Sequence, residues 1–272
     1  MKQLKTFLAY LLLTAAALWM IFPFLWMLST SFKTNTGVLA MPPKLIPDPF
    51  TTENYRRVAE TFPVGRFFLN SLFVAVTATA GHLLTASMAA YAFARLQWRG
   101  RDAIFLLYLA TLMIPQQVTL TPLFILMTLI GWTDSYQALI LPGFFGAFGT
   151  FLMRQFLLTI PRSLEEAAFV DGASHWTVFW RIILPLSRPA LSTLMVFTFM
   201  GNWNAFLWPL VVTSNPKFMT LPLGLATLQG RWATEWNLVM AGAVLNVMPM
   251  ILVYLVAQKQ FIKGVTLSGI KG

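Results

Sequence analysis

The 272-residue chain contains no cysteine and only two histidines, His82 and His175. The lack of cysteine excludes disulfide bonds, thiolate catalysis and cysteine-ligated metal sites, and two imidazoles make a histidine metal site implausible. No Gly-x-x-x-x-Gly-Lys-Ser/Thr run occurs, so the chain has no loop of that kind to hold the phosphates of ATP. The sequence thus offers no catalytic centre of these classes.

Charged residues are also scarce. They make up 10% of the chain, whereas 57% of the residues are hydrophobic, and a soluble domain has roughly 25% charged residues. This composition predicts an all-α integral membrane protein with about six helical spans of roughly 20 residues each. We predict the spans at Phe7–Leu28, Phe67–Ala94, Ile104–Ile130, Ala138–Leu158, Ala190–Val212 and Leu238–Gln258. The first apolar run is too long for a typical signal peptide, so we predict that it is not cleaved.

The net charge of +10 follows the predicted topology rather than a nucleic-acid surface. With the N-terminus inside, 12 of the 19 Lys and Arg residues fall on inner segments, as the positive-inside rule requires. These are Lys2, Lys5, Arg95, Arg99, Arg101, Arg154, Arg162, Arg181, Arg188, Lys259, Lys263 and Lys271. Both termini, and the polar stretch at residues 161–189, are therefore predicted to be cytoplasmic.

That polar stretch lies between two apolar runs. Ser163 is followed three residues later by Glu166, which predicts a capping box and a short helix from Ser163 through Asp171. Gly172 then permits the backbone to turn. Ser174 can cap a second short helix, which the two prolines at 185 and 189 end. We expect a helix-turn-helix outside the bilayer, with three apolar residues of its second helix at helical spacing: Trp176, Phe179 and Ile183.

Small and charged residues in this helix-turn-helix favour docking to another protein. Ala167, Ala168 and Ala173 leave room for a partner to approach, while Glu166 and Asp171 offer charge to a basic surface. The alternative is that these residues only cap a helix, turn the chain and solvate a helix end.

The same stretch resembles the EAA loop of ABC-importer permease subunits. The matching positions are Glu166-Ala167-Ala168, Asp171-Gly172-Ala173, Phe179, Ile182, Leu184-Pro185 and Pro189. The resemblance implies a type I ABC importer permease fold with six transmembrane helices. It also implies a cytoplasmic coupling helix in a cleft of a separate ATPase subunit, with ATPase coupling assigned to Glu166, Ala167, Ala168, Asp171, Gly172 and Ala173. The chain is then not an enzyme and holds no cofactor, and ATP and Mg belong to the partner subunits.

Polar residues within three predicted spans are candidates for a translocation path. Pro115 breaks the third span beside Gln116 and Gln117, whose amides either line a pathway or bond a neighbouring helix. Asn246 lies in the sixth span close to Pro249. The lone His82 of the second span is either a packing residue or a proton relay, and we favour packing.

The fifth span carries a cluster of amides and aromatic rings. Amides hydrogen-bond sugar hydroxyls and aromatic faces stack on sugar rings, and an interfacial aromatic belt is the alternative. The cluster resembles the Trp-Asn-x-Phe-x-x-Pro-Leu signature of carbohydrate-importing permeases, which favours the path. Its candidate path residues are Asn202, Trp203, Asn204 and Trp208.

Two further segments are assigned through the resemblance. In similar permeases the loop at residues 213–237 contacts the solute-binding protein, which here implicates Phe218, Trp232 and Trp236; the alternative is a loop packed on its own domain. The tail at residues 259–272 has too many glycines for a stable helix, so an extended segment is predicted. It resembles the ending of the sugar-importer branch, where the tail enters the interface between two ATPase subunits, and this assigns Gly264, Gly269 and Lys271.

The resemblance covers essentially the whole chain and is closest to the smaller permease subunit of the maltose-transporter-like carbohydrate family. It implies an N-terminal span and periplasmic loop at residues 1–66 and a permease core at 67–272. The implied partners are a second homologous permease, two ATPase subunits, an extracellular or periplasmic solute-binding protein, a sugar and membrane lipid, with no nucleic acid. The implied location is the bacterial inner membrane. The alternatives are an ABC importer permease for an amino acid, peptide, polyol or sugar phosphate, a secondary transporter, and a structural scaffold.

Overall fold

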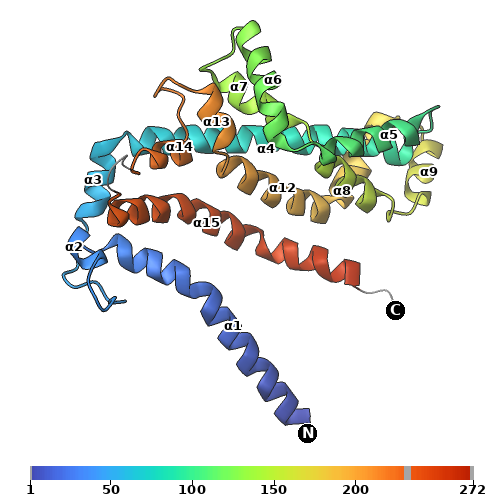
Figure 1. Ribbon diagram of the computed structural model, residues 1–272. Coiled ribbons are helices and arrows are strands. Elements are labelled where there is room, and N and C mark those ends of the chain that lie inside the picture. The colour runs from blue at the N-terminus through green and yellow to red at the C-terminus, as the bar shows by residue number, and fades with distance from the viewer. Residues whose placement is uncertain (1, 230–233, 270–272) are drawn as a thin grey trace. The chain divides into compact units, whose positions relative to one another are not determined.

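The computed structural model describes residues 2–229 and 234–269 of the chain. This described part is helical, and it contains no strand beyond an isolated bridge between Gln229 and Thr234. The all-α prediction is confirmed. The chain divides into two compact units, Met1–Gly65 with Leu221–Pro249 and Arg66–Thr220 with Met250–Gly272, whose helices are labelled in Figure 1.

The first unit is held together by buried amides. The side-chain amide of Asn54 donates to the Ser31 and Lys33 carbonyls, at 2.8 Å each, and its oxygen accepts from Nδ2 of Asn237 at 2.8 Å. These bonds join the end of α1, the start of α3 and the start of α15. The elements of the unit are α1 (Lys2–Ser31), α2 (Asn35–Val38), α3 (Glu53–Thr61), α14 (Leu221–Ala226) and the first part of α15 (Trp236–Gly269).

The second unit is built along α4 (Val64–Arg95). Towards its C-terminus α4 presents small residues, including Ala86 and Ala90, to a core with Met153 and Leu157, and small residues allow membrane helices to approach closely. The other helices are α5 (Arg101–Ala110), α6 (Gln116–Leu129), α7 (Tyr136–Ile140), α8 (Ala147–Leu157), α9 (Ser163–Val170), α10 (His175–Val178), α11 (Leu184–Leu186), α12 (Arg188–Trp203) and α13 (Leu207–Val212). Short non-α turns are η1 (Thr111–Met113), η2 (Leu141–Phe144) and the π-helical η3 (Phe179–Ile183).

Helix α4 approaches the start of α8 closely at His82. A Cβ atom added at Gly149 would lie 2.3 Å from Nε2 of His82, and one added at Gly146 would lie 2.7 Å from Cε1 of the same ring. His82 is buried. These contacts support the packing role for His82, since glycine is needed where the ring meets the α8 backbone.

Candidate membrane spans agree with five of the six that the sequence predicts. The bounds predicted for the fifth, Ala190–Val212, are wrong, because α12 ends at Trp203 and α13 is a separate helix; the candidate pair here is His175–Leu186 with Arg188–Trp203, which meet at 76°. In the described residues, four helical segments are long and apolar enough to cross a bilayer, and two bent pairs bring the total to six if each pair is one span.

The third predicted span, however, is bent by a much larger angle than a proline within a helix would produce. Its limbs Arg101–Met113 and Gln116–Leu129 meet at 100°, because the chain is extended at Ile114 and Pro115, with ψ values of 116° and 136°.

The prediction of an extended C-terminal tail is wrong for residues 259–269. Helix α15 does not end near Gln258 but continues to Gly269, so it includes Gly264. A helix that is already nucleated gains one hydrogen bond per added residue, and each glycine costs only about 1 kcal/mol. Lys271 lies outside the described residues.

Candidate functional site

The polar stretch folds as a helical hairpin, residues 163–178, which we call the docking hairpin. Its first helix, α9, begins at Ser163, but Ser163 makes no capping bond there. The predicted capping box is wrong because Arg162 already has helical φ and ψ angles (−66°, −27°), and its carbonyl accepts from the Glu165 and Glu166 amides. Ser163 therefore lies one position inside the helix.

The turn of the hairpin forms as predicted. Gly172 has φ +81°, and the amide of Ala173 donates to the Ala168 carbonyl at 2.9 Å while that of Gly172 donates to Phe169 at 3.0 Å. This pair of bonds is a Schellman motif, which needs a left-handed residue at the glycine position. The predicted Ser174 cap is confirmed, since its hydroxyl accepts from the Thr177 amide at 3.2 Å.

The predicted docking residues lie on two sides of the hairpin. Four are exposed, namely Glu166, Ala167, Asp171 and Gly172. The other two, Ala168 and Ala173, are partly buried and pack against the core that α4, α8 and α12 share. Exposed apolar side chains adjoin the first group, with Val170 88% and Trp176 59% exposed. The accessible face thus combines acidic, small and apolar groups.

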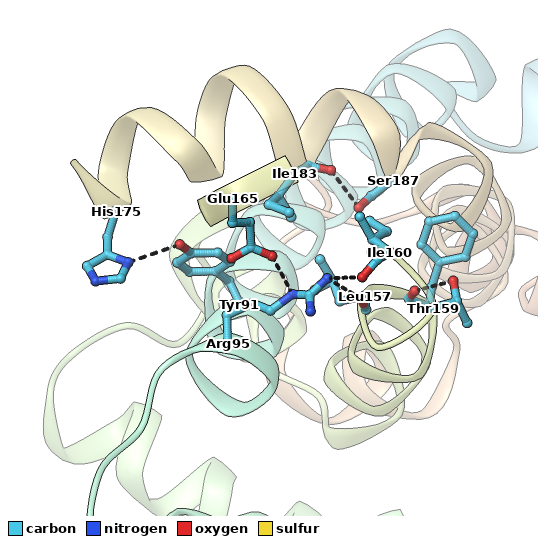
Figure 2. A network of polar contacts seen from close by, with 10 residues as sticks. Tyr91, Arg95, Leu157, Thr159, Ile160, Glu165, His175, Ile183 and Ser187 are labelled. Atoms are coloured by element: carbon cyan, nitrogen blue, oxygen red, sulfur yellow. Dashed lines mark hydrogen bonds and ion pairs between the residues drawn. The ribbon is translucent and has the colours of Figure 1, made fainter. Parts of the chain in front are cut away.

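A buried ion pair connects the hairpin to α4, and sequence reasoning missed it. Nε of Arg95 lies 2.7 Å from Oε1 of Glu165, and the two side chains are 4% and 8% exposed. It is a close ion contact rather than an aligned hydrogen bond. Burial raises the pKa of the Glu165 carboxyl, and the positive charge of Arg95 opposes that rise. Figure 2 shows the guanidinium between this carboxylate and two backbone carbonyls.

Those carbonyls belong to the last residue of α8 and to the loop that follows it. Nη2 of Arg95 donates to the Leu157 and Ile160 carbonyls at 2.7 Å each, and the Leu157 carbonyl would otherwise be among the unpaired groups that end a helix. One turn earlier on α4, the Tyr91 hydroxyl lies 3.3 Å from Nδ1 of His175. A single α4 terminus thus contacts α8, α9 and α10.

A cavity of about 570 Å³ lies elsewhere in the second unit, at the breaks of its helices. Four predicted path residues line it: Gln116, Asn202, Asn204 and Trp208. The indole nitrogen of Trp208 donates to the Ala138 carbonyl at 2.8 Å, so its polar atom holds α13 on α7. Thr220, which sequence reasoning missed, also lines the cavity, and its buried hydroxyl has no hydrogen-bond partner among the described residues.

A buried asparagine fixes the loop before Thr220. Nδ2 of Asn70 donates to the Lys217 and Met219 carbonyls at 2.9 and 2.8 Å, and its Oδ1 accepts from the Tyr136 hydroxyl at 2.7 Å. The sequence signal for this role was an asparagine near the start of the second predicted span.

The remaining predicted path residues do not line this cavity. Trp203 is completely buried, with its ring 5.5 Å from Phe68 and 5.9 Å from Phe199. Gln117 follows Gln116 in α6 but is not part of the cavity lining. Asn246 lies in the α15 segment that belongs to the first unit.

The predicted binding-protein contacts are divided between the units. Phe218, in the second unit, packs edge-on against Tyr136 at 5.1 Å. Trp236 begins α15 in the first unit and is 48% exposed. Trp232 lies outside the described residues.

Known proteins resemble this chain over nearly its full length. The sequence profile described as "Binding-protein-dependent transport system inner membrane component" matches residues 81–266. The arabinooligosaccharides transport system permease protein AraQ of Halalkalibacterium halodurans is 35% identical over 255 residues, which cover 93% of this chain and 91% of the relative. The sn-glycerol-3-phosphate transport system permease protein UgpE of Yersinia enterocolitica is 33% identical over 263 residues, or 94% of each chain.

Solved structures give the same result for the fold. A chain from the crystal structure of a bacterial ABC transporter involved in the import of the acidic polysaccharide alginate matches with a TM-score of 0.82 and 26% identity. The match covers 95% of this chain and 97% of that chain.

Proposed function

The chain belongs to the family of binding-protein-dependent transport system inner membrane components, and on that premise we propose that it is one of two permease subunits of an ATP-driven importer of neutral sugars. It is a multi-pass membrane protein of the ABC importer permease fold. The observation that carries the sugar assignment is the cavity lined by Gln116, Asn202 and Asn204 beside the Trp208 ring.

The chemistry of this cavity favours a polyhydroxylated solute. Side-chain amides and hydroxyls exchange hydrogen bonds with sugar hydroxyls, and apolar faces receive the C–H side of a sugar ring. The amide nitrogens of Asn202 and Asn204 donate to the carbonyls of Thr198 and Met200. Their oxygens are therefore the atoms that we assign to solute hydroxyls.

The same lining argues against an anionic solute. None of the described residues that line the cavity is Lys, Arg, Asp or Glu, whereas a phosphate or carboxylate held away from water needs cationic partners. A permease for a sugar phosphate is the second candidate, because one relative carries sn-glycerol-3-phosphate transport in its name.

Energy would reach this chain through the docking hairpin. We assign its exposed residues Glu166, Ala167, Asp171 and Gly172 to contact with a separate ATPase subunit, which would hold ATP and Mg. This requires the hairpin and both termini to be cytoplasmic, as the distribution of Lys and Arg predicts. On the opposite face, Phe218, Trp232 and Trp236 are assigned to a solute-binding protein.

The transport cycle follows from these assignments. ATP closes the pair of ATPase subunits, the hairpin moves with the subunit that holds it, and the spans reorient to open the cavity outward. A ligand shifts such an equilibrium only through different contacts in the two states. Hydrolysis then restores the inward-open state and the solute leaves.

Uptake by the complete transporter in proteoliposomes tests the proposal. The complex with its own binding protein is given radiolabelled neutral oligosaccharide, sn-glycerol 3-phosphate or an amino acid. We expect ATP-dependent uptake of the neutral sugar and about a tenfold loss in Asn204→Ala, which removes a solute hydrogen bond. Val211→Ala, an exposed position outside the cavity lining, serves as the control. Uptake of only the phosphate or the amino acid would refute the sugar assignment.

A further inference from the structure

The docking hairpin is attached to the rest of the second unit in an unusual way. Glu165 is the only buried residue of α9. The large apolar residues of the helix, Leu164, Phe169 and Val170, are 44%, 37% and 88% exposed. An ordinary surface helix is oriented by an apolar stripe that faces the core. In α9 the side chain in that inward position is a carboxylate.

The partner of that carboxylate belongs to a helix distant in sequence. Arg95 ends α4, and its guanidinium contacts Glu165 while it donates to the Leu157 and Ile160 carbonyls at and after the end of α8. Figure 2 shows these contacts converging on one side chain. Because the guanidinium is planar and its donors are fixed in direction, the position of α9 is defined relative to both α4 and α8.

Such a pair defines position more than it adds stability. Two buried charges lose hydration, and replacing them by apolar residues of similar volume is often neutral or stabilising. Burial raises the pKa of the Glu165 carboxyl, although the positive charge of Arg95 opposes the rise. This direction agrees with a pair that contributes little net stability. If stability alone were required, apolar residues at both positions would serve as well.

We propose that Arg95 and Glu165 are positioning residues for energy coupling, which tie α9 rigidly to α4 so that a displacement of the docking hairpin is passed to the membrane helices. The proposal rests on the proposed function, in which the hairpin is held by an ATPase subunit. Tyr91 and His175 supply a second contact at 3.3 Å, between α4 and α10, the other helix of the docking hairpin, which restricts rotation about the first.

The test uses the complete transporter, and the absence of cysteine makes the chain suited to site-specific labels. Spin labels are placed at Val170→Cys on α9 and Met88→Cys on α4, both exposed positions, and the distribution of the distance between them is measured. In the same preparation, solute uptake and ATP hydrolysis are measured to give the solute transported per ATP hydrolysed. We expect Glu165→Gln to broaden the distance distribution about twofold and to lower the transport ratio about tenfold, a typical size for a coupling effect.

Glu60→Gln makes the same chemical change at an exposed carboxylate, 62% exposed, and should leave both readouts at the wild-type value. The double variant Arg95→Met with Glu165→Leu covers the case in which Glu165→Gln does not fold. It should fold, because it leaves neither buried charge without its partner, and it should still show the broader distribution and the lower ratio.

A narrow distance distribution with an unchanged transport ratio, in Glu165→Gln or in the double variant, would overturn the proposal. Apolar packing would then be enough to hold the hairpin. Failure of the proposed function looks different. In that case the wild-type chain would not assemble with an ATPase subunit, while the distance measured in the full-length wild-type and variant chains would still report whether the pair orders α9.

Discussion

The two ends of the second unit's longest helix, α4, deal with buried polar groups in opposite ways. Near its C-terminus, Arg95 meets a carboxylate and two carbonyls, so a charged group is surrounded by partners. In the N-terminal half of α4, Val74 borders a cavity that is also lined by Thr220. The Thr220 hydroxyl has no hydrogen-bond partner among the described residues. On the proposed function, the region that would move as a rigid body has its buried charge paired, whereas the region that would bind and release a solute keeps a hydroxyl available for hydrogen bonding.

Removing the charge at the bonded end gives the largest expected effect. Arg95→Met leaves the Glu165 carboxylate buried and releases the Leu157 and Ile160 carbonyls. We expect a loss of about 3–5 kcal/mol in unfolding free energy, seen as a lower thermal unfolding midpoint in detergent. Arg99→Gln, at an exposed position in the turn between α4 and α5, should leave the midpoint unchanged. If Arg95→Met and Arg99→Gln had equal midpoints, the contacts of Arg95 would not stabilise the C-terminal end of α4, and that end would not differ from the cavity end.

The middle of α4 should show an effect of intermediate size that does not involve charge. Gly149→Ala places a methyl group 2.3 Å from Nε2 of His82, and we expect overpacking to cost about 1–3 kcal/mol. Gly65→Ala, in the same helix as His82 and with nothing within 4 Å of the added carbon, is the control. If Gly149→Ala were as stable as Gly65→Ala, the close contact between α4 and α8 would be refuted.

The caps of the docking hairpin provide a smaller, paired test. Ser174→Ala removes the bond to the Thr177 amide and should cost about 1 kcal/mol. Ser163→Ala removes no capping bond and should be close to neutral. Hydrogen exchange at the Thr177 amide should accelerate in Ser174→Ala, and exchange at the Glu166 amide should be unchanged in Ser163→Ala. Faster exchange at Glu166 would show that Ser163 forms the capping box after all.

The smallest change in stability is expected at the cavity. Thr220→Val keeps the shape of the side chain and removes a buried hydroxyl without a hydrogen-bond partner among the described residues, so we expect no loss of unfolding free energy. Uptake should fall, because a group that we assign to the solute is lost. A large drop in the thermal unfolding midpoint with normal uptake would show that the Thr220 hydroxyl is hydrogen-bonded within the protein, as the buried groups around Arg95 are.

Much of the fold could be predicted from the sequence because long apolar runs have few alternatives in a membrane. Five of the span positions, the turn at Gly172 and the Ser174 cap depend on residues close together in the chain. The fifth predicted span was wrong in its bounds, because the apolar run continues across the break between α12 and α13 with no charged residue in the sequence. The start of α9 was misjudged by one position, since a helical conformation at Arg162 cannot be inferred from its side chain. The 100° bend at Pro115 was underestimated, because a proline limits one residue and does not fix the direction of the limbs.

The pair between Arg95 and Glu165 could not be predicted for a different reason. The two residues are 70 positions apart, and each has a simpler local explanation. An arginine at the end of a span matches the positive-inside rule, and Glu165 adjoins a glutamate of the motif. Only the tertiary structure shows that one of two adjacent glutamates is buried and the other exposed. For Thr220, a threonine in a polar loop carries no distinguishing signal.

The broken pair formed by α5, η1 and α6 has a consequence for lipid. The limbs contain 13 and 14 residues, so each extends only about 20 Å at 1.5 Å per residue. A hydrocarbon core is about 30 Å thick, and limbs meeting at 100° cannot add their lengths. Beside α5 and α6 the helical limbs are too short to match an undistorted bilayer. The bilayer must therefore thin there, unless a second subunit replaces the lipid.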